Sequence, residues 1–242
     1  MMRLLIDAGN TNIKLALVVD DNWSAVVNCP SNQAGDLSFA DHGYNGVQQV
    51  WVSNVAGAEV AWQIVDACAA RHWSPQFITA QVAQCGVRNG YALPVQLGAD
   101  RWAALIAAWH HVGRACLVVN SGTATTIDAL SDGGEFLGGL ILPGIELMQR
   151  SLTVATANLQ AAGGVYSDFP RNTADALLSG AIQAGCGAIQ RQHALLEVAD
   201  APILLSGGAA HMLSPHLNLP VQMMDNLVLQ GLLLIAQETS KS

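Results

Sequence analysis

The chain contains an internal repeat. The segment that begins at Leu4 reads LLIDAGNTNIKLAL, and the segment that begins at Leu117 reads LVVNSGTATTIDAL. Without gaps, Leu4 aligns with Leu117 and Gly9 aligns with Gly122. Both segments have an apolar run, a polar residue, a small residue, a glycine, short polar residues and a second apolar run. A duplicated plan of this kind predicts two similar lobes.

Each copy is typical of a strand, a tight turn and a second strand. The run 4–6 is wholly apolar, as a buried strand would be. Gly9 lets the backbone turn where a side chain would clash. Ile13, Leu15 and Leu17 then alternate with polar or small residues, and residues 20–22 are Asp, Asp and Asn, which favour a turn into a third strand.

The residues after each glycine are suited to binding phosphate. Main-chain N–H groups and hydroxyl groups would face one spot there, and such donors match phosphate oxygens. The alternative is that both segments are merely tight hairpins, because a glycine after a strand is common. Two aligned copies that both carry hydroxyl residues favour two phosphate-binding turns at a shared cleft. The hydroxyls belong to Thr11, Thr123, Thr125 and Thr126.

The rest of the sequence predicts mixed α/β lobes. We expect the lobe boundary near Gly113, with an N-terminal lobe of 1–112 and a C-terminal lobe of 113–242. Glycines within the helix expected at 174–198 weaken the expectation that this helix is continuous. Strands are expected at 51–53 and 116–119, and helices at 58–71, 99–112, 174–198 and 227–238.

Composition limits the possible partners. Apolar residues make up 51% of the chain and charged residues 12%, which fits a globular protein. Eighteen acidic against ten basic side chains give a net charge of −8, which disfavours nucleic acid as a partner. No stretch reaches the roughly 20 apolar residues of a membrane span. The five cysteines are scattered and never paired as CxxC, which predicts reduced thiols in a cytoplasmic protein.

Three side chains could carry chemistry, and one pair of glycines could line a binding site. Asp7 ends the first strand, where a carboxylate beside phosphate oxygens would suit Mg²⁺, although an Asp there can also simply form the turn. Asp100 precedes an apolar helix face and could accept a proton from a hydroxyl, but spacing alone favours a helix cap. Arg101 could bind a carboxylate. Gly207 and Gly208 follow an apolar strand and would let a base or ribose lie on the backbone.

Five motifs in order resemble one known family. They are DAGNTNIK (7–14), GADR (98–101), NSGTATTID (120–128), GGLILPG (138–144) and SGGAA (206–210). Together they are similar to the motifs of type III pantothenate kinase, whose members share the duplicated ribonuclease-H-like, actin-like fold of sugar kinases and heat-shock chaperones. The resemblance implies α/β architecture in two lobes with a nucleotide cleft between them. It also implies ATP-dependent phosphorylation of pantothenate, the first step of coenzyme A synthesis.

The resemblance also implies a role for individual residues. Asp100 would be the catalytic base that takes the proton of the pantothenate hydroxyl, and Asp7 would lie nearest Mg²⁺. The residues implied to bind ATP are Asp7, Ala8, Gly9, Asn10, Thr11, Asn12, Ile13, Lys14, Thr123, Gly207 and Gly208. The residues implied to bind pantothenate are Tyr91, Gly98, Ala99, Asp100, Arg101 and Thr173.

One position departs from the family pattern. The second phosphate motif usually opens with an Asp that helps to hold a monovalent cation, and here Asn120 stands at that position. An amide oxygen can coordinate K⁺ or NH₄⁺ but brings no charge, so we expect no tight K⁺ site of the usual kind. Members of the family are homodimers with pantothenate near the subunit interface, and the resemblance implies the same here.

Two other functions remain open at this point. The chain could be another small-molecule kinase or a phosphatase of the same superfamily. It could also be a non-catalytic regulatory factor, because some members of the family were first described as accessory factors for gene expression. The presence of Asp7, Asp100 and Arg101 argues against a relative without activity.

Overall fold

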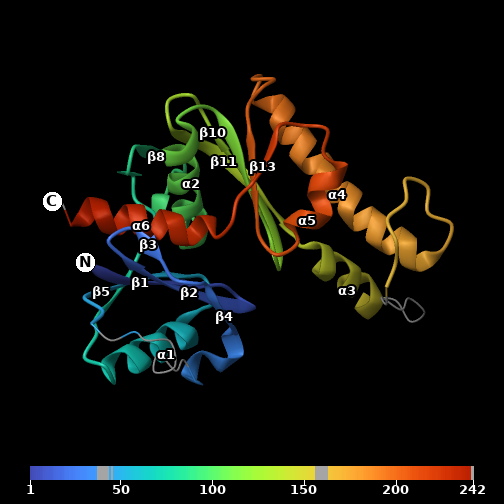
Figure 1. Cartoon of the computed structure of the whole chain (residues 1–242). Helices are drawn as coiled ribbons and strands as arrows, with labels where there is room; N and C mark the ends of the chain where they lie inside the picture. The colour runs from blue at the N-terminus through green and yellow to red at the C-terminus, as the bar shows by residue number, and fades with distance from the viewer. Residues whose placement is uncertain (37–43, 45, 156–162, 241–242) are drawn as a thin grey trace. The chain divides into compact units, whose positions relative to one another are not determined.

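Two units, each built around its own sheet, make up the chain, and we describe them from a computed structural model that covers residues 1–36, 44, 46–155 and 163–240. The first unit contains Met1–His111 and Leu227–Ser242, and the second contains Val112–Asn226 (Figure 1). The first break lies within one residue of the boundary expected from the sequence. The C-terminal segment differs, because the sequence placed it in the second lobe and the structure places it in the first unit.

In the first unit, the central strand is β1 (Met2–Ala8). It pairs antiparallel with β2 (Asn12–Val19) and parallel with β5 (Gln49–Asn54). Beyond β5 lies β6 (Pro75–Phe77), which is parallel to it. On the other side, β2 pairs with β3 (Asn22–Trp23) and β4 (Val27–Pro30). The turn between β2 and β3 uses Asp20 and Asp21 at φ 45° and 67°, which confirms the turn that the sequence predicted.

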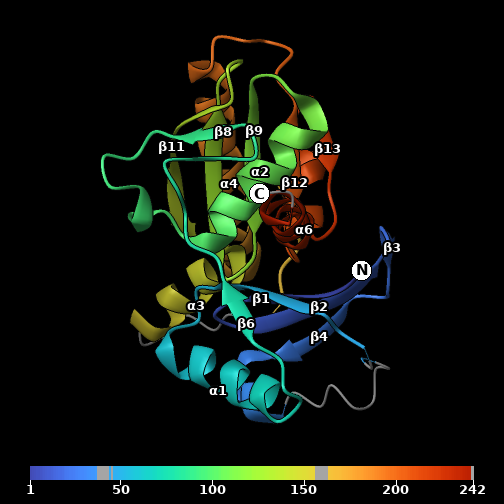
Figure 2. The ribbon, with the colours of Figure 1, turned by 90° about the vertical axis from the view of Figure 1, so that its left-hand side faces the viewer.

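Helices cover both faces of this sheet. Figures 1 and 2 show α1 (Ala58–Ala69) on one face and α6 (Leu227–Thr239) on the other. Ile6, Ile13 and Ile64 belong to the core on the α1 side. The unit is completed by the 3₁₀ segments η1 (Ser31–Asp36) and η3 (Pro94–Gln96), the antiparallel pair β7 (Ala83–Gln84) and β8 (Val87–Asn89), and α2 (Ala99–Val112).

The packing of α6 explains why the C-terminal segment belongs to the first unit. A Cβ atom added to Gly231 of α6 would lie only 1.9 Å from the carbonyl oxygen of Ala103 in α2. The two helix backbones therefore approach each other more closely than any side chain would allow. Leu229 and Leu232 of α6 are fully buried. An apolar helix ends the sequence, and nothing in its pattern indicates which sheet it covers.

The second unit repeats the strand plan of the first. Its central strand β9 (Cys116–Ser121) is antiparallel to β10 (Ala124–Leu130), which is antiparallel to β11 (Glu135–Pro143). On its other side, β9 is parallel to β12 (Ile203–Ser206), and β12 is parallel to β13 (Val221–Met223). The order β11-β10-β9-β12-β13 matches the order β3-β2-β1-β5-β6. The duplication predicted from the repeat is thus present in the sheets.

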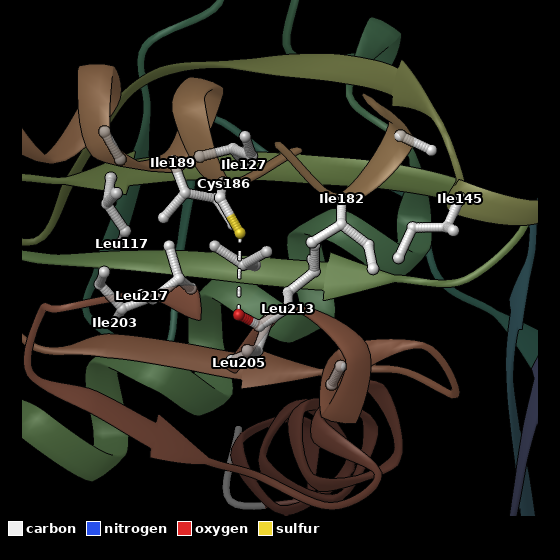
Figure 3. Close-up of a cluster of buried hydrophobic side chains, with 14 residues drawn as sticks. Leu117, Ile127, Ile145, Ile182, Cys186, Ile189, Ile203, Leu205, Leu213 and Leu217 are labelled. Atoms are coloured by element: carbon white, nitrogen blue, oxygen red, sulfur yellow. Dashed lines mark hydrogen bonds between the residues drawn. The ribbon is translucent and has the colours of Figure 1, made fainter. Parts of the chain in front are cut away.

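Helices of the second unit pack on this sheet. They are α3 (Ile145–Ala155), α4 (Thr173–Leu195), α5 (Ala210–Leu213) and the 3₁₀ segment η4 (Ser214–His216). Figure 3 shows Ile182, Cys186 and Ile189 of α4 against Ile127 and Leu117 of the strands. The glycines in α4 do not interrupt it. Within the residues described, no helix combines the length and apolar character needed to cross a bilayer.

Candidate active site

The first glycine turn joins β1 to β2 and directs its polar residues outward. The N–H group of Gly9 donates to the carbonyl oxygen of Asn12 at 3.1 Å, which closes the turn. Asn10, Thr11 and Asn12 are exposed, whereas Ala8 and Ile13 on either side are buried. The turn therefore offers polar groups to a ligand from a fixed base.

The second glycine turn has the same construction between β9 and β10. The N–H group of Gly122 donates to the carbonyl oxygen of Ala124 at 2.9 Å. Below the turn, the hydroxyl oxygens of Ser121 and Thr125 lie 3.1 Å apart and are buried. Thr123, at the tip, is exposed. The hydroxyl of Thr125 thus supports the turn, and Thr123 is the one that a ligand could reach.

Gly144 holds the second turn from behind. Its N–H group donates to the carbonyl oxygen of Thr123 at 2.8 Å. A Cβ atom at Gly144 would lie 2.0 Å from the carbonyl oxygen of Gly122, so only glycine fits. Gly144 is the last residue of the GGLILPG motif (138–144). The structure shows a backbone approach that no residue with a side chain could make.

The Gly207-Gly208 pair lies beside the second turn. Gly207 has φ +98°, and a Cβ atom there would lie 2.2 Å from the carbonyl oxygen of Ser121 and 2.6 Å from Oδ1 of Asn120. The N–H group of Ala209 donates to the carbonyl oxygen of Ser121 at 3.0 Å. Gly208 is exposed, and a Cβ atom there would meet nothing within 4 Å. The structure thus brings the predicted adenosine turn, Asn120 and the second phosphate turn together.

In the first unit, Asp7 is held in an environment that disfavours its charge. The pKa of Asp7 is raised from 3.8 to about 7, first because the side chain is buried and second because the carboxylate of Asp100 lies nearby. Lys14 and the Ser53 hydroxyl act in the opposite direction. Lys14 and Ser53 occupy the positions directly beside Asp7 on the neighbouring strands β2 and β5. Two carboxylates and one ammonium group are therefore gathered beside the first turn.

Asp100 is the second residue of α2. Burial raises its pKa, and the backbone N–H group of Arg101, which donates to Oδ1 at 2.7 Å, lowers it. A Cβ atom at Gly98 would lie 2.6 Å from the same Oδ1. The missing side chain at Gly98 therefore leaves room for the carboxylate to fold back over the start of the helix. A carboxyl group of raised pKa is well matched to accepting a proton near neutral pH.

Arg101 and Tyr91 meet in the first unit. Arg101 is buried, and its Nη1 donates to the hydroxyl oxygen of Tyr91 at 3.2 Å. The guanidinium carbon lies 5.9 Å from the centroid of the Tyr91 ring. A buried guanidinium held by an aromatic side chain is preorganised for a carboxylate ligand. Tyr91 and Arg101, both implied by the resemblance to bind pantothenate, are thus in contact.

Thr173 lies in the second unit, at the first position of α4. Asn172 caps this helix by accepting a hydrogen bond from the N–H group of Asp175 at 3.0 Å. Thr173 is exposed at the rim of a cavity of about 450 Å³ between α3 and α4. Helix α3, which supplies one wall of this cavity, was not predicted from the sequence. The lining residues are Met148, Ser151, Leu152, Thr173, Ala176, Leu177, Gly180 and Ala181.

The residues around Asp7 are compatible with Mg²⁺. In the part of the chain that the structure describes, no cluster of three or more His, Cys, Asp or Glu residues could form an all-protein metal site. Mg²⁺ does not need one, because it is usually bound by one or two carboxylates together with phosphates and water. The Ser53 hydroxyl is buried next to Asp7. Among the residues that the structure describes, it has no hydrogen-bond partner that satisfies both the distance and the angle of such a bond. A cation at Asp7 would offset the repulsion between the two carboxylates.

Sequence reasoning missed several residues of this site. Ser31 contacts the first turn, Ser53 lies beside Asp7, and Gly144 supports the second turn. Ser31 and Ser53 belong to no motif, and strand pairing alone places them. For Gly144, the glycine after Pro143 was a signal, but the contact that requires it could not be read from the sequence.

The fold and the paired glycine turns define a class of protein. The chain has the two-unit architecture of the actin-like and sugar-kinase ATPases. It aligns over 97% of its length with a chain described as a 2-dehydro-3-deoxygalactonokinase of Sinorhizobium meliloti (TM-score 0.62, 16% identity, 96% of that chain). It also aligns over 99% with a chain described as a Baf family transcriptional activator of Campylobacter jejuni (TM-score 0.62, 22% identity, 100% of that chain). At these identities the likeness concerns the fold alone.

Within that class, the chain belongs to the type III pantothenate kinase family. The family profile matches residues 3–194. A type III pantothenate kinase of Nitrosospira multiformis is 49% identical over 99% of this chain and 92% of its own length. One of Aromatoleum aromaticum is 47% identical over 98% of both chains. The family that the five motifs resembled is therefore confirmed.

Proposed function

We propose that this chain transfers the terminal phosphoryl group of ATP to pantothenate and so produces 4′-phosphopantothenate in the first step of coenzyme A synthesis. Membership of the type III pantothenate kinase family over most of the chain supports this function. The structural observation that carries it is the pair of carboxylates beside the first glycine turn, where Asp100 lies close enough to Asp7 to raise its pKa. A phosphoryl-transfer site needs a metal ligand and a base, and these two residues can divide those tasks.

We assign the glycine turns to ATP. The exposed residues of the first turn and Thr123 of the second present N–H and hydroxyl groups that suit phosphate oxygens. Gly207 and Gly208 leave the backbone bare beside the second turn, where the adenosine would lie. The residues of this assignment are Asp7, Ala8, Gly9, Asn10, Thr11, Asn12, Ile13, Lys14, Thr123, Gly207 and Gly208.

Asp7 would hold Mg²⁺, together with phosphate oxygens and water. When bound, the ion supplies positive charge that offsets the charge on the β- and γ-phosphates. The protein's own contribution is to fix Asp7 between Lys14 and Ser53, with its carboxylate partly removed from water. Binding of a cation there would also remove the cost of keeping two carboxylates near each other.

Asp100 would act as the base. The hydroxyl oxygen of pantothenate forms a bond to the γ-phosphorus, the bond from that phosphorus to the β–γ bridging oxygen breaks, and ADP leaves. The hydroxyl proton passes to the carboxylate of Asp100. The N–H group of Arg101 holds this carboxylate in one orientation, and Gly98 leaves room for it. Most of the rate enhancement would come from positioning and charge stabilisation.

Further donors would hold the rest of pantothenate. Arg101 is buried and fixed by Tyr91, and a guanidinium group held in this way is suited to the carboxylate of the substrate. Gly98 and Ala99 place this pair next to Asp100. Thr173 would contact the substrate with its hydroxyl from the start of α4.

We further propose that the enzyme binds K⁺ or NH₄⁺ only weakly. Asn120 is the penultimate residue of β9 and lies beside Gly207, and its side-chain oxygen could coordinate a cation but brings no charge. We also propose that the protein is a homodimer that works in the cytoplasm. The cavity between α3 and α4 has a mainly apolar lining, with Thr173 at its rim. This lining supports a subunit contact at the cavity.

An acceptor assay tests the proposed function. ADP release is followed with pantothenate, with common sugars and with water as the only acceptor, and the product is identified by mass. We expect release to depend on pantothenate, to match phosphopantothenate one to one, and to stop when Mg²⁺ is chelated. Faster release with a sugar, or with water alone, would point to another activity of the superfamily. Repeating the assay with and without K⁺ and NH₄⁺ tests the weak cation site, which predicts a small difference.

A further inference from the structure

Ser31 lies directly behind the first glycine turn, although it is distant in sequence. It follows the last residue of β4, which pairs with β2 so that Pro30 lies opposite Asn12. The side chain of Ser31 is buried, with 5% of its surface exposed. This serine belongs to none of the motifs that identify the family.

Ser31 binds the turn at two points. Its hydroxyl donates to the carbonyl oxygen of Gly9 at 2.6 Å. Its backbone N–H group donates to the carbonyl oxygen of Thr11 at 2.9 Å. The third bond of the turn, from the N–H group of Gly9 to the carbonyl oxygen of Asn12, lies within the turn itself. The carbonyl oxygens of Gly9, Thr11 and Asn12 are thus all occupied on the protein side.

These bonds decide where the N–H groups point. In a trans peptide, the C=O and N–H bonds are antiparallel in one plane. Since the carbonyl of Gly9 points at Ser31, the N–H group of Asn10 points away from Ser31. The same holds for the carbonyl of Thr11 and the N–H group of Asn12. Ser31 therefore turns these donors toward the exposed side of the loop.

The segment that carries Ser31 is anchored in the core. Ser31 begins η1, and Ala34 of the same segment is fully buried in the core with Ile13 and Ile64. A short polar turn that is exposed on one side would otherwise populate many backbone conformations, and ordering it on binding would cost free energy. Ser31 removes this cost in advance.

We propose that Ser31 is a positioning residue that preorganises the first glycine turn for phosphate binding, an inference that rests on the assignment of this turn to ATP. The hydroxyl fixes the Gly9–Asn10 peptide, and the backbone N–H group fixes the Thr11–Asn12 peptide. Replacement by Ala removes the first of these constraints and leaves the second. The loss should therefore appear in nucleotide binding and not in pantothenate binding.

The test compares Ser31→Ala with two other variants. Ser31→Thr keeps the hydroxyl. Ser24→Ala is a matched control, because the Ser24 hydroxyl also bonds to backbone groups but lies in the exposed connection beyond β3, where it donates to the carbonyl oxygen of Ala25 at 2.9 Å. Binding of a non-hydrolysable ATP analogue with Mg²⁺ is measured by calorimetry, and KM for each substrate and kcat are measured separately.

We expect Ser31→Ala to weaken binding of the analogue and raise KM for ATP by about tenfold, the effect of one lost hydrogen bond to a partly buried carbonyl oxygen. KM for pantothenate should stay unchanged. Ser31→Thr and Ser24→Ala should bind the analogue like the wild type. Amide hydrogen exchange at residues 9–12 should be faster in Ser31→Ala than in Ser24→Ala, although both should unfold at similar temperatures.

Two outcomes would overturn the inference. One is wild-type affinity for the analogue in a folded Ser31→Ala protein. The other is an equal loss for both substrates, which would indicate a general structural role. If Ser31→Ala does not fold, Ser31→Cys carries the test, because it keeps a weaker donor of similar size and should lose part of the affinity for the analogue. A wild-type protein that does not bind the analogue would contradict the proposed function itself.

Discussion

Asp100 combines the features of a base in one residue. It is partly buried, its pKa is raised, and its orientation is fixed by the N–H group of Arg101 and by the space that Gly98 leaves. Spacing alone favoured a helix cap, and the observed bond to the first turn of α2 shows that this reading was partly right.

Replacing Asp100 with Asn tests this role. The amide keeps the shape but cannot accept the proton, so we expect kcat to fall by roughly 10²- to 10⁴-fold. Affinity for ATP should stay close to that of the wild type, because Asp100 is not part of either glycine turn. Asp66→Asn, on the exposed surface of α1, is the control. Near-normal turnover in Asp100→Asn would remove this residue from the base role.

Asp7 provides a prediction about stability. Its pKa is raised from 3.8 to about 7 in the folded protein, so the folded state binds more protons than the unfolded state between these values. The free energy of unfolding contributed by Asp7 therefore falls as the pH rises through this range and stays low above it. Removing the charge should help the protein fold at high pH and should abolish turnover.

We expect Asp7→Asn, without nucleotide or Mg²⁺, to be more stable than the wild type by roughly 1–2 kcal/mol at pH 8, since one pKa unit is about 1.4 kcal/mol and the partial exposure of Asp7 reduces the total. At pH 4 the difference should be close to zero. Urea unfolding at both pH values measures it, with Asp66→Asn alongside. An equal difference at both pH values would contradict the pKa of Asp7.

At the scale of elements, the sequence predicted the parts that depend on local chemistry. The apolar runs and glycines placed both hairpins, and helix α2 has the bounds that its apolar spacing predicted. Contacts between distant segments were not predictable in this way. Ser31 reaches a residue 22 positions earlier, and nothing local to Ser31 indicates that its partner is a carbonyl of the glycine turn.

Glycine within a helix shows the same limit. Gly187 of α4 and Gly231 of α6 both lower helix propensity, and the sequence does not distinguish them. In the structure, a Cβ atom at Gly187 would meet nothing within 4 Å, whereas one at Gly231 would lie 1.9 Å from the carbonyl oxygen of Ala103. The first glycine is tolerated in its helix, and the second is required by the contact between two helices.

Changing each of these glycines to Ala separates the two effects. Gly231→Ala should push α6 away from α2 and destabilise the protein by about 1–3 kcal/mol, as overpacking does. Gly187→Ala should stabilise it by roughly 0.5–1 kcal/mol through helix propensity. Thermal unfolding of both variants measures the two shifts. A harmless Gly231→Ala substitution would mean that α6 does not pack on α2 as described.

At the scale of the whole molecule, duplication explains the arrangement of functional residues. Each unit presents a glycine turn at the end of its central strand, after β1 in one and after β9 in the other. The two units differ in the other candidate functional residues that they carry. The first carries both carboxylates and the Arg101–Tyr91 pair, and the second carries Gly207, Gly208 and Thr173. On the proposed assignment, one duplicated plan would supply phosphate donors twice, and the additions would supply chemistry and specificity.

The surface around α3 bears on how subunits would assemble. Helix α3 has a single buried residue, Ile145, and its Leu152 and Val154 are 47% and 83% exposed. Next to it lies the cavity of about 450 Å³ whose lining is mainly apolar. Exposed apolar surface of this kind is typical of a face that another protein covers. A second copy of this chain is the partner that the family resemblance implies.

A charge placed in the cavity between α3 and α4 tests whether a second copy of the chain binds there. Ala176→Glu puts a carboxylate among the lining residues, so we expect the dimer to dissociate and KM for pantothenate to rise, since Thr173 lies at the same rim. Ala194→Glu is the matched control, because Ala194 is exposed on the same helix about 27 Å further along. Light scattering coupled to size exclusion gives the mass of each variant. If Ala176→Glu remains a dimer with normal kinetics, the subunits meet through another surface, because a buried, unpaired charge could not be accommodated at this one.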